Sequence, residues 1–111
     1  MQSTGEAVLA VLMTAEPAAK VMAARRAARE WRMDRLTHAF PVEMPDMPAR
    51  PSRPALLRPR DMPRRGKGTS ITRRVALIHA LAHIEFVAID LAFDMIGRFG
   101  AEFPREFTDD W

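Results

Sequence analysis

The sequence predicts an all-α protein, and two observations predict it. Residues 3–33 and 71–99 are rich in helix-favouring side chains, and their apolar residues recur at helical spacing. Between them, residues 41–70 hold most of the prolines, so no regular element fits there. We therefore expect three regions: an N-terminal helical region (1–40), an extended strap rich in Pro and Arg (41–70) and the first part of a helical bundle (71–111).

The N-terminal region is expected to form a pair of helices. Thr14, followed by Glu16 and Pro17, is a good break and restart, because Pro suits a first helical turn and Thr can cap exposed amides. An approximate apolar stripe on the second helix is made by Val21, Ala24, Ala28, Trp31 and Arg32. The cations that lie largely off this stripe are Lys20, Arg25, Arg26 and Arg29. The pattern is that of an ordinary amphipathic helix.

The strap is predicted to be an extended, polyproline-like chain. Each proline removes a backbone donor and biases the preceding residue away from the helical conformation. We expect the strap to lie across a helical surface, held there by its apolar side chains. These are Val42, Met44, Met47, Leu56, Leu57 and Met62.

One long helix is predicted from Ile71 to about Phe99. Thr69–Ser70 is a fair N-cap for it. Gly97 and Gly100 loosen its end, and Pro104 forbids its continuation. Apolar residues lie on most of its sides, which is expected for a helix embedded in a bundle.

The closing segment FTDDW reads as the start of another helix. Thr108 would be its cap, and Asp109 and Asp110 would stand in the first turn, where acids interact favourably with the helix dipole. A capped helix without a body indicates that the sequence is incomplete.

Composition limits the classes of protein. A chain of 111 residues suits one small domain, and the absence of cysteine excludes a disulfide framework or a thiolate metal site. Residues 75–99 are apolar enough to suggest a membrane helix, but Glu85, Asp90 and Asp94 would each be costly in lipid. Residues 1–17 make a poor secretory signal. The sequence therefore predicts a soluble, cytoplasmic protein with no membrane partner.

Charge is distributed unevenly around the net value of +3. Residues 49–74 are strongly basic and residues 75–111 are mostly acidic, which suits intramolecular pairing as well as a partner site. The run RRGKGTS (64–70) could hold a phosphate, although the Walker spacing is absent. A small anion or RNA binder using Arg58 to Arg74 is a third reading, but no aromatic residue accompanies these cations. Nucleic acid is therefore not an expected partner.

Glu85 stands in the middle of the long apolar helix. At 100° per residue it shares a stripe with Ile71, Ile78, Ala82, Ile89, Ala92 and Ile96. A buried carboxylate is costly unless something pairs with it. Its partner is either an Arg from the strap or a neighbouring helix, or a metal ion, since inward-facing carboxylates of bundle helices bind dinuclear iron or manganese.

His79 and His83 are four residues apart and share a helix face, as two zinc ligands would. The residue after His79 is not the Glu that the metalloprotease motif needs, so that reading fails. Their face lies roughly 120° or more from Glu85 around the helix. We expect the two histidines to hydrogen-bond Asp90, Asp94 or the strap.

The segment PARPSRPALLRPRDMPRRGKGTS, followed by RRVALIHALAHIEFVAIDLAFDMIGRF, resembles a bacterial family of ferritin-like proteins catalogued as domain of unknown function 455. The resemblance extends to AEPAAKVMAARRAAREW and to FTDDW, so it covers nearly the whole chain. It implies a ferritin-like four-helix bundle after an N-terminal extension, with residues 71–99 as its first long helix. Members look like distant relatives of dinuclear iron proteins, including tRNA-modifying hydroxylases, but no settled activity comes with the family.

The resemblance implies a metal ligand at Glu85. In such bundles one helix gives a Glu, which Glu85 matches, and the next gives a Glu-x-x-His pair, which this chain lacks. The chain is therefore expected to be an N-terminal portion, truncated before that helix. His79, His83 and Asp90 would be supporting groups, and Asp90 stands where relatives are expected to carry Glu. Iron or manganese is implied for the complete protein, and neither is expected to bind tightly to this chain alone.

Two functions of different classes follow. The first is the N-terminal part of a ferritin-like protein whose complete form is a dinuclear-metal oxidoreductase, with the substrate and the enzymatic status of this chain left open. The alternative is a non-enzymatic helical interaction module, with Glu85 paired to an Arg of the strap, or a non-functional truncated remnant. In each case a second copy or a partner helix is expected to cover the exposed bundle face.

Overall fold

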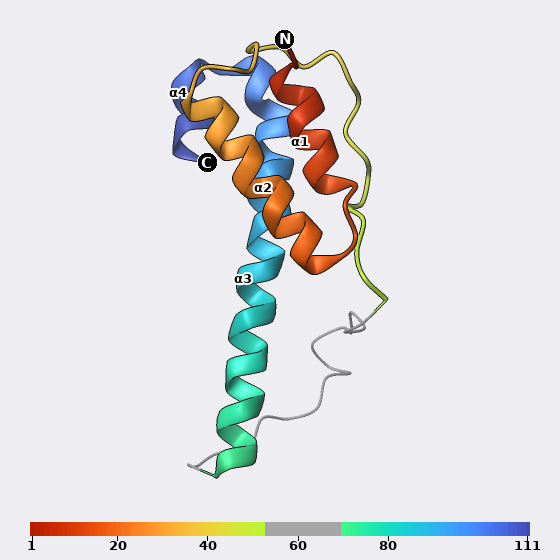
Figure 1. Ribbon diagram of the computed structural model, residues 1–111, viewed down its shortest axis with the longest axis vertical. Coiled ribbons are helices and arrows are strands. Elements are labelled where there is room, and N and C mark those ends of the chain that lie inside the picture. Colours follow the sequence, from red (N-terminus) through yellow and green to blue (C-terminus); the bar gives the residue numbers. More distant parts are fainter. Residues whose placement is uncertain (53–69) are drawn as a thin grey trace.

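The structure, a computed structural model, describes residues 1–52 and 70–111. Within them the elements are α1 (Thr4–Leu12), α2 (Pro17–Arg32), α3 (Ile71–Phe99), the 3₁₀ helix η2 (Gly100–Glu102) and α4 (Arg105–Asp110). These two ranges contain no strand, so the predicted all-α class is confirmed. Figure 1 shows α1 and α2 beside the C-terminal part of α3, whose N-terminal part extends away from them.

A capping box fixes the start of α1. The Ser3 hydroxyl accepts a hydrogen bond from the Glu6 N–H (3.1 Å), and the Glu6 carboxylate accepts one from the Ser3 N–H (3.2 Å). The side-chain and backbone hydrogen bonds from Ser3 hold the pKa of the Glu6 carboxyl below its ordinary value of 4.5. The backbone N–H groups of Thr4 and Gly5 donate to carbonyls in residues 37–39 (2.8 and 3.0 Å). The start of α1 therefore lies against the segment that follows α2.

Glu16, and not Thr14, caps α2. The Glu16 carboxylate accepts hydrogen bonds from two amides of the first turn, at 3.1 and 2.6 Å. Thr14 instead donates to the Ala10 carbonyl (2.6 Å) at the end of α1. The predicted Thr14 cap is therefore wrong, because Pro17 occupies the first helical position and makes residue 16 the cap.

The core is shared by α1, α2 and the C-terminal part of α3. Its two groups of buried apolar residues are Ala7, Val11, Ala27 and Leu36, and Val8, Leu12 and Ile96. Phe93 of α3 packs against both groups. The predicted regions 1–40 and 71–111 thus contribute to one core, while their boundaries as separate units stay a prediction.

Residues 41–52 of the strap lie against the helices and form no helix or strand. Met44 packs on the group around Leu12, and the Ala49 N–H donates to the Leu12 carbonyl (2.7 Å). Met47, an expected anchor, is largely exposed. The other expected anchors, Leu56, Leu57 and Met62, lie outside the described residues, as does most of the basic run.

α3 has the predicted bounds, and the Ser70 hydroxyl accepts a hydrogen bond from the Arg73 N–H (3.3 Å) at its start. Its predicted enclosure is wrong, because Asp90 and Ile96 are its only buried side chains in the described structure. The exposed large apolar residues of α3 are Ile71, Val75, Leu77, Ile78, Leu81, Ile84, Leu91 and Phe99. The segment Ile71–Glu102 is long and apolar enough to cross a membrane. Core helices of soluble proteins also meet this criterion of length and composition.

α4 starts earlier than predicted. It begins at Arg105, directly after Pro104, so Thr108 lies inside the helix, is buried and does not cap it. Asp109 consequently stands near the end of the helix and not in its first turn. It accepts a hydrogen bond from the indole Nε1 of Trp31 (2.8 Å), which ties α4 to the end of α2.

Candidate functional site

Glu85 lies on α3 one turn before Ile89, which packs against the core. Its side chain is exposed, so the sequence-based assumption that this charge is buried is wrong for the described structure. Leu81 and Ile84, its neighbours on the helix, are 52% and 56% exposed. The carboxylate therefore stands within an apolar surface that the described residues leave open.

The two histidines of α3 do not form the expected bonds with aspartates. His79 is exposed, and His83 is half-buried beside Arg50 and Pro51 of the strap. Both aspartates have other partners. Arg98 donates to the Asp94 carboxylate (2.7 Å), and the buried ammonium of Lys20 forms an ion pair with Asp90. His83 lies beside the strap, and its predicted hydrogen bond to the strap stays a prediction.

The described residues do not build a metal centre by themselves. No group of three or more His, Asp or Glu side chains among residues 1–52 and 70–111 is placed to hold a metal ion. Glu85 and the histidines occupy different sides of α3. A dinuclear centre would need several more carboxylate or imidazole donors from other helices.

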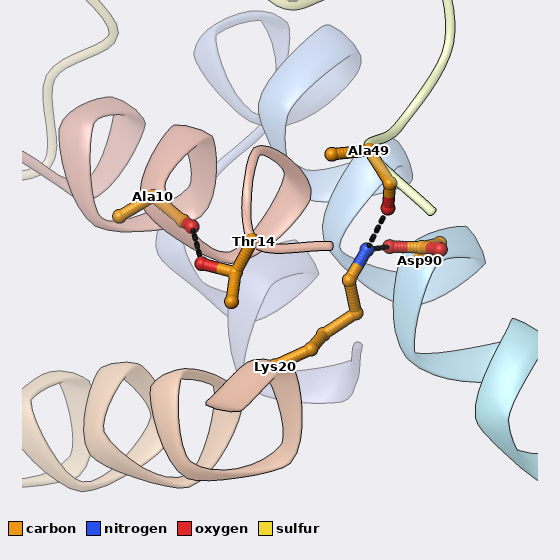
Figure 2. Close-up of polar contacts among 5 residues, drawn as sticks. All are labelled: Ala10, Thr14, Lys20, Ala49 and Asp90. Carbon is orange, nitrogen blue, oxygen red and sulfur yellow. Dashed lines mark hydrogen bonds and ion pairs between the residues drawn. The ribbon is translucent and has the colours of Figure 1, made fainter. Parts of the chain in front are cut away.

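The buried polar centre of the molecule joins Lys20 of α2 to Asp90 of α3 (Figure 2). The Lys20 ammonium donates to the Asp90 carboxylate and to the Ala49 carbonyl (2.9 Å), so it connects two helices and the strap. The side chains of Lys20 and Asp90 are 0% and 4% exposed. Asp90 Oδ2 has no hydrogen-bond partner in the described structure.

This pair corrects two sequence-based assignments. Lys20 was expected away from the packed face of α2, and Asp90 was expected to hydrogen-bond a histidine and support a metal site. A signal for Lys20 was present, because Ala27 lies seven residues further, close to two helical turns, and therefore shares its face. Ala27 is buried with it. No sequence pattern identified Asp90 as its partner 70 residues away.

A groove of about 1100 Å³ lies between α2 and α3 and is also lined by residues of α1 and α4. Its apolar lining comes from three helices and includes Ala7, Val8, Ala24, Ala28, Ile89 and Phe93. Four arginines of α2 also line it: Arg25, Arg26, Arg29 and Arg32. Thr108 and Trp111 line the groove as well, so the C-terminal residues are part of its wall.

A protein-family model described as "Protein of unknown function (DUF455)" matches residues 13–111. The chain belongs to this family. The matched part includes Lys20, Glu85 and Asp90 but not α1, which ends at Leu12. The family description assigns no activity.

A relative in Haemophilus influenzae, described as an uncharacterized protein, is 39% identical over 80 residues. The match covers 65% of this chain and 27% of the relative, so the chain spans about a quarter of that protein's length. No solved structure matches the chain.

Proposed function

We propose that this chain is the N-terminal part of a ferritin-like helical bundle in which Glu85 is a metal ligand. The observation that carries the proposal is a carboxylate in the middle of an exposed apolar helix surface. Large patches of this kind mark surfaces that bind another element. A carboxylate enclosed by such an element would need a cation beside it.

Two further observations support a larger bundle. The chain belongs to a family in which one relative is much longer than the matched segment. The exposed part of α3 is also too long to be covered by α1 and α2, which pack beside its C-terminal part (Figure 1). In the proposal, further helices cover this surface and bring the remaining donors to iron or manganese. The complete protein would then be a cytoplasmic dinuclear-metal oxidoreductase.

The supporting residues have different roles in this proposal. His79 is exposed on α3, and a covering helix would bring it into contact with other side chains. His83 lies against the strap and would hold it beside the site. Asp90 is bonded to Lys20, so it would act by fixing α3 against α2 and not by touching the metal.

The test is metal analysis of the protein produced from its intact gene, as wild type and as Glu85→Gln. Iron or manganese should copurify with the wild type and fall about tenfold or more in the variant, since losing even a hydrogen-bond partner of a ligand costs 10- to 100-fold in metal affinity. Glu102→Gln, an exposed change in η2, is the matched control, and this variant should keep its metal. Background metal in all three proteins would contradict the proposal.

The second candidate is a non-enzymatic helical interaction module or a truncated remnant. It is favoured by the lack of any three-residue metal-ligating group within the described ranges. In this case Glu85→Gln changes stability or partner binding while metal content stays at background. A remnant without function would show neither metal nor a partner.

A further inference from the structure

The groove between α2 and α3 has features that Glu85 and its proposed metal do not use. Its α2 wall includes the small side chains of Ala24 and Ala28, together with larger ones such as Met22 and Trp31. Ile89 and Phe93 of α3 line the opposite side. Small residues on one helix permit another helix axis to approach within about 8–10 Å. The groove thus has the shape of a helix-binding surface.

Three arginines form a ladder along one flank of this wall. Arg25, Arg29 and Arg32 follow an i, i+4, i+7 spacing, lie within about 60° of helical arc and span about 10 Å along α2. All three are exposed, and none forms an ion pair with an acid in the parts of the chain that the structure describes. Asp109, an acid in the lining, is instead bonded to Trp31. The ladder is therefore a row of uncompensated positive charge beside an apolar surface.

A buried polar group in the lining of the groove provides an independent sign of a missing partner. Thr108 is 6% exposed and lines the groove, yet its hydroxyl has no hydrogen-bond partner in the described structure. Buried hydroxyls are normally bonded. A polar side chain entering the groove would satisfy this one.

The aromatic end of the groove is already held in place. Trp31 is fixed by its hydrogen bond to Asp109 (2.8 Å), and the Arg105 guanidinium lies 4.2 Å from the centre of its ring. Trp111, which also lines the groove, is 50% exposed. Because the ring of Trp31 is already held, binding against it carries a smaller ordering cost.

We propose that this groove binds an acidic amphipathic α-helix of a partner protein. The partner's apolar stripe would pack on the alanines of α2 and on Ile89 and Phe93. Its carboxylates, at an i, i+4, i+7 spacing, would meet the arginine ladder. A small ligand with a single carboxylate would leave two of the three arginines unpaired. Nucleic acid would leave the apolar lining of the groove uncovered. This proposal does not depend on metal at Glu85.

Two synthetic peptides of about 15 residues provide the test, since shorter isolated helices are marginal in water. They share an Ala/Leu stripe and differ only at the ladder positions, which are Glu in one peptide and Lys in the other. Fluorescence anisotropy with the full chain should show at least about tenfold tighter binding of the Glu peptide, weakening as salt rises. The fluorescence of Trp31 and Trp111, the two tryptophans of the chain, should change on binding.

Two variants locate the binding. The triple change Arg25→Gln, Arg29→Gln and Arg32→Gln should remove the preference for the Glu peptide. The matched control, Arg35→Gln with Arg73→Gln and Arg74→Gln, removes the same charge from exposed positions outside the groove. This control should keep the preference for the Glu peptide. Ala28→Trp, which fills the groove, should abolish binding of both peptides while the circular dichroism of the helices is unchanged.

Three outcomes would overturn the proposal. Equal affinity for the two peptides would show that the three arginines do not discriminate between acidic and basic helices. An equal loss in both triple variants would show general attraction to a basic protein. If sedimentation shows a dimer that the first triple variant disrupts, the occupant is a second copy of this chain and not a partner helix.

Discussion

The Lys20 ammonium lies against the Asp90 carboxylate, and water reaches neither side chain to a significant extent. Buried ion pairs of this kind contribute little net stability compared with apolar residues, but removing one partner leaves an isolated buried charge. The pair also determines which turn of α3 lies opposite the start of α2. Its value to the fold is therefore the fixed alignment of the two helices.

Breaking this pair should be far more costly than replacing it. Lys20→Met is expected to destabilise the fold by about 3–5 kcal/mol, because Asp90 is left charged and enclosed. The double variant Lys20→Met with Asp90→Leu should regain most of that loss. Urea denaturation followed by circular dichroism measures both. Asp94→Asn, which breaks the more exposed pair with Arg98, should cost about 1 kcal/mol or less and is the control. A Lys20→Met cost no greater than the control value would contradict the prediction.

The capping box of α1 should make stability depend on pH in acid. The pKa of the Glu6 carboxyl is lowered in the folded protein by its hydrogen bonds from Ser3, so its stabilising contribution is present above its ordinary pKa of 4.5. That contribution is lost as the pH falls through the lowered value. The difference in Tm between wild type and Glu6→Gln should therefore be largest near neutral pH and should shrink towards pH 3. Ser3→Ala also removes the cap on the Glu6 backbone N–H, so adding it to Glu6→Gln should produce a further loss of Tm that changes little with pH.

Two glycines near the end of α3 should respond differently to alanine. A Cβ at Gly100 would lie 2.5 Å from Cζ of the Phe40 ring, which is packed and cannot bend away. A Cβ at Gly97 would meet the flexible side chain of Met44, with Cγ at 2.8 Å. Gly100→Ala is expected to cost about 1–3 kcal/mol, the usual range for overpacking. Gly97→Ala should cost less, because moving Met44 is easy and Ala gains about 1 kcal/mol in helix propensity. Thermal unfolding of the two variants should show this order.

The exposed surface of α3 should make the 111-residue chain associate with itself when nothing else covers it. Changing Ile78, Leu81 and Ile84 to Gln should shift sedimentation towards the monomer, because these side chains are 62%, 52% and 56% exposed. Met13→Gln with Met33→Gln removes exposed apolar residues elsewhere and should leave the association unchanged. A wild type that stays monomeric at high concentration would show that this surface does not associate by itself.

The helices could be predicted from local sequence, because their signals are local. Ser70 and Gly100 mark the ends of α3, and Pro17 marks the start of α2. The caps were less predictable, since Thr14 and Glu16 compete for one role and only the position of the first helical turn decides between them. Thr108 was misassigned for the same reason, because Pro104 starts α4 sooner.

The packing could not be predicted in the same way. Periodicity shows that a helix has an apolar face but does not say what covers it, so the enclosure expected for α3 was wrong for the described structure. The burial of Lys20 depended on Asp90, a residue 70 positions away. Glu85 could be identified as a candidate because a charge in an apolar run is visible in the sequence. The arginine ladder could not be identified as a site from the sequence, because charges on one side of a helix usually face water.

Asp90 also separates two parts of α3 that differ in how easily their backbone hydrogen bonds open. Between Asp90 and Phe99 its backbone amides can open only when the core opens, since side chains of α1 and α2 hold this part. Towards Ser70, helical hydrogen bonds are retained with little packing against α1 and α2, so these turns can fray one at a time. Amide hydrogen exchange should therefore be slow near Ile96 and progressively faster towards Ile71. A partner that covers the exposed turns would remove this gradient and convert α3 into a uniformly protected rod.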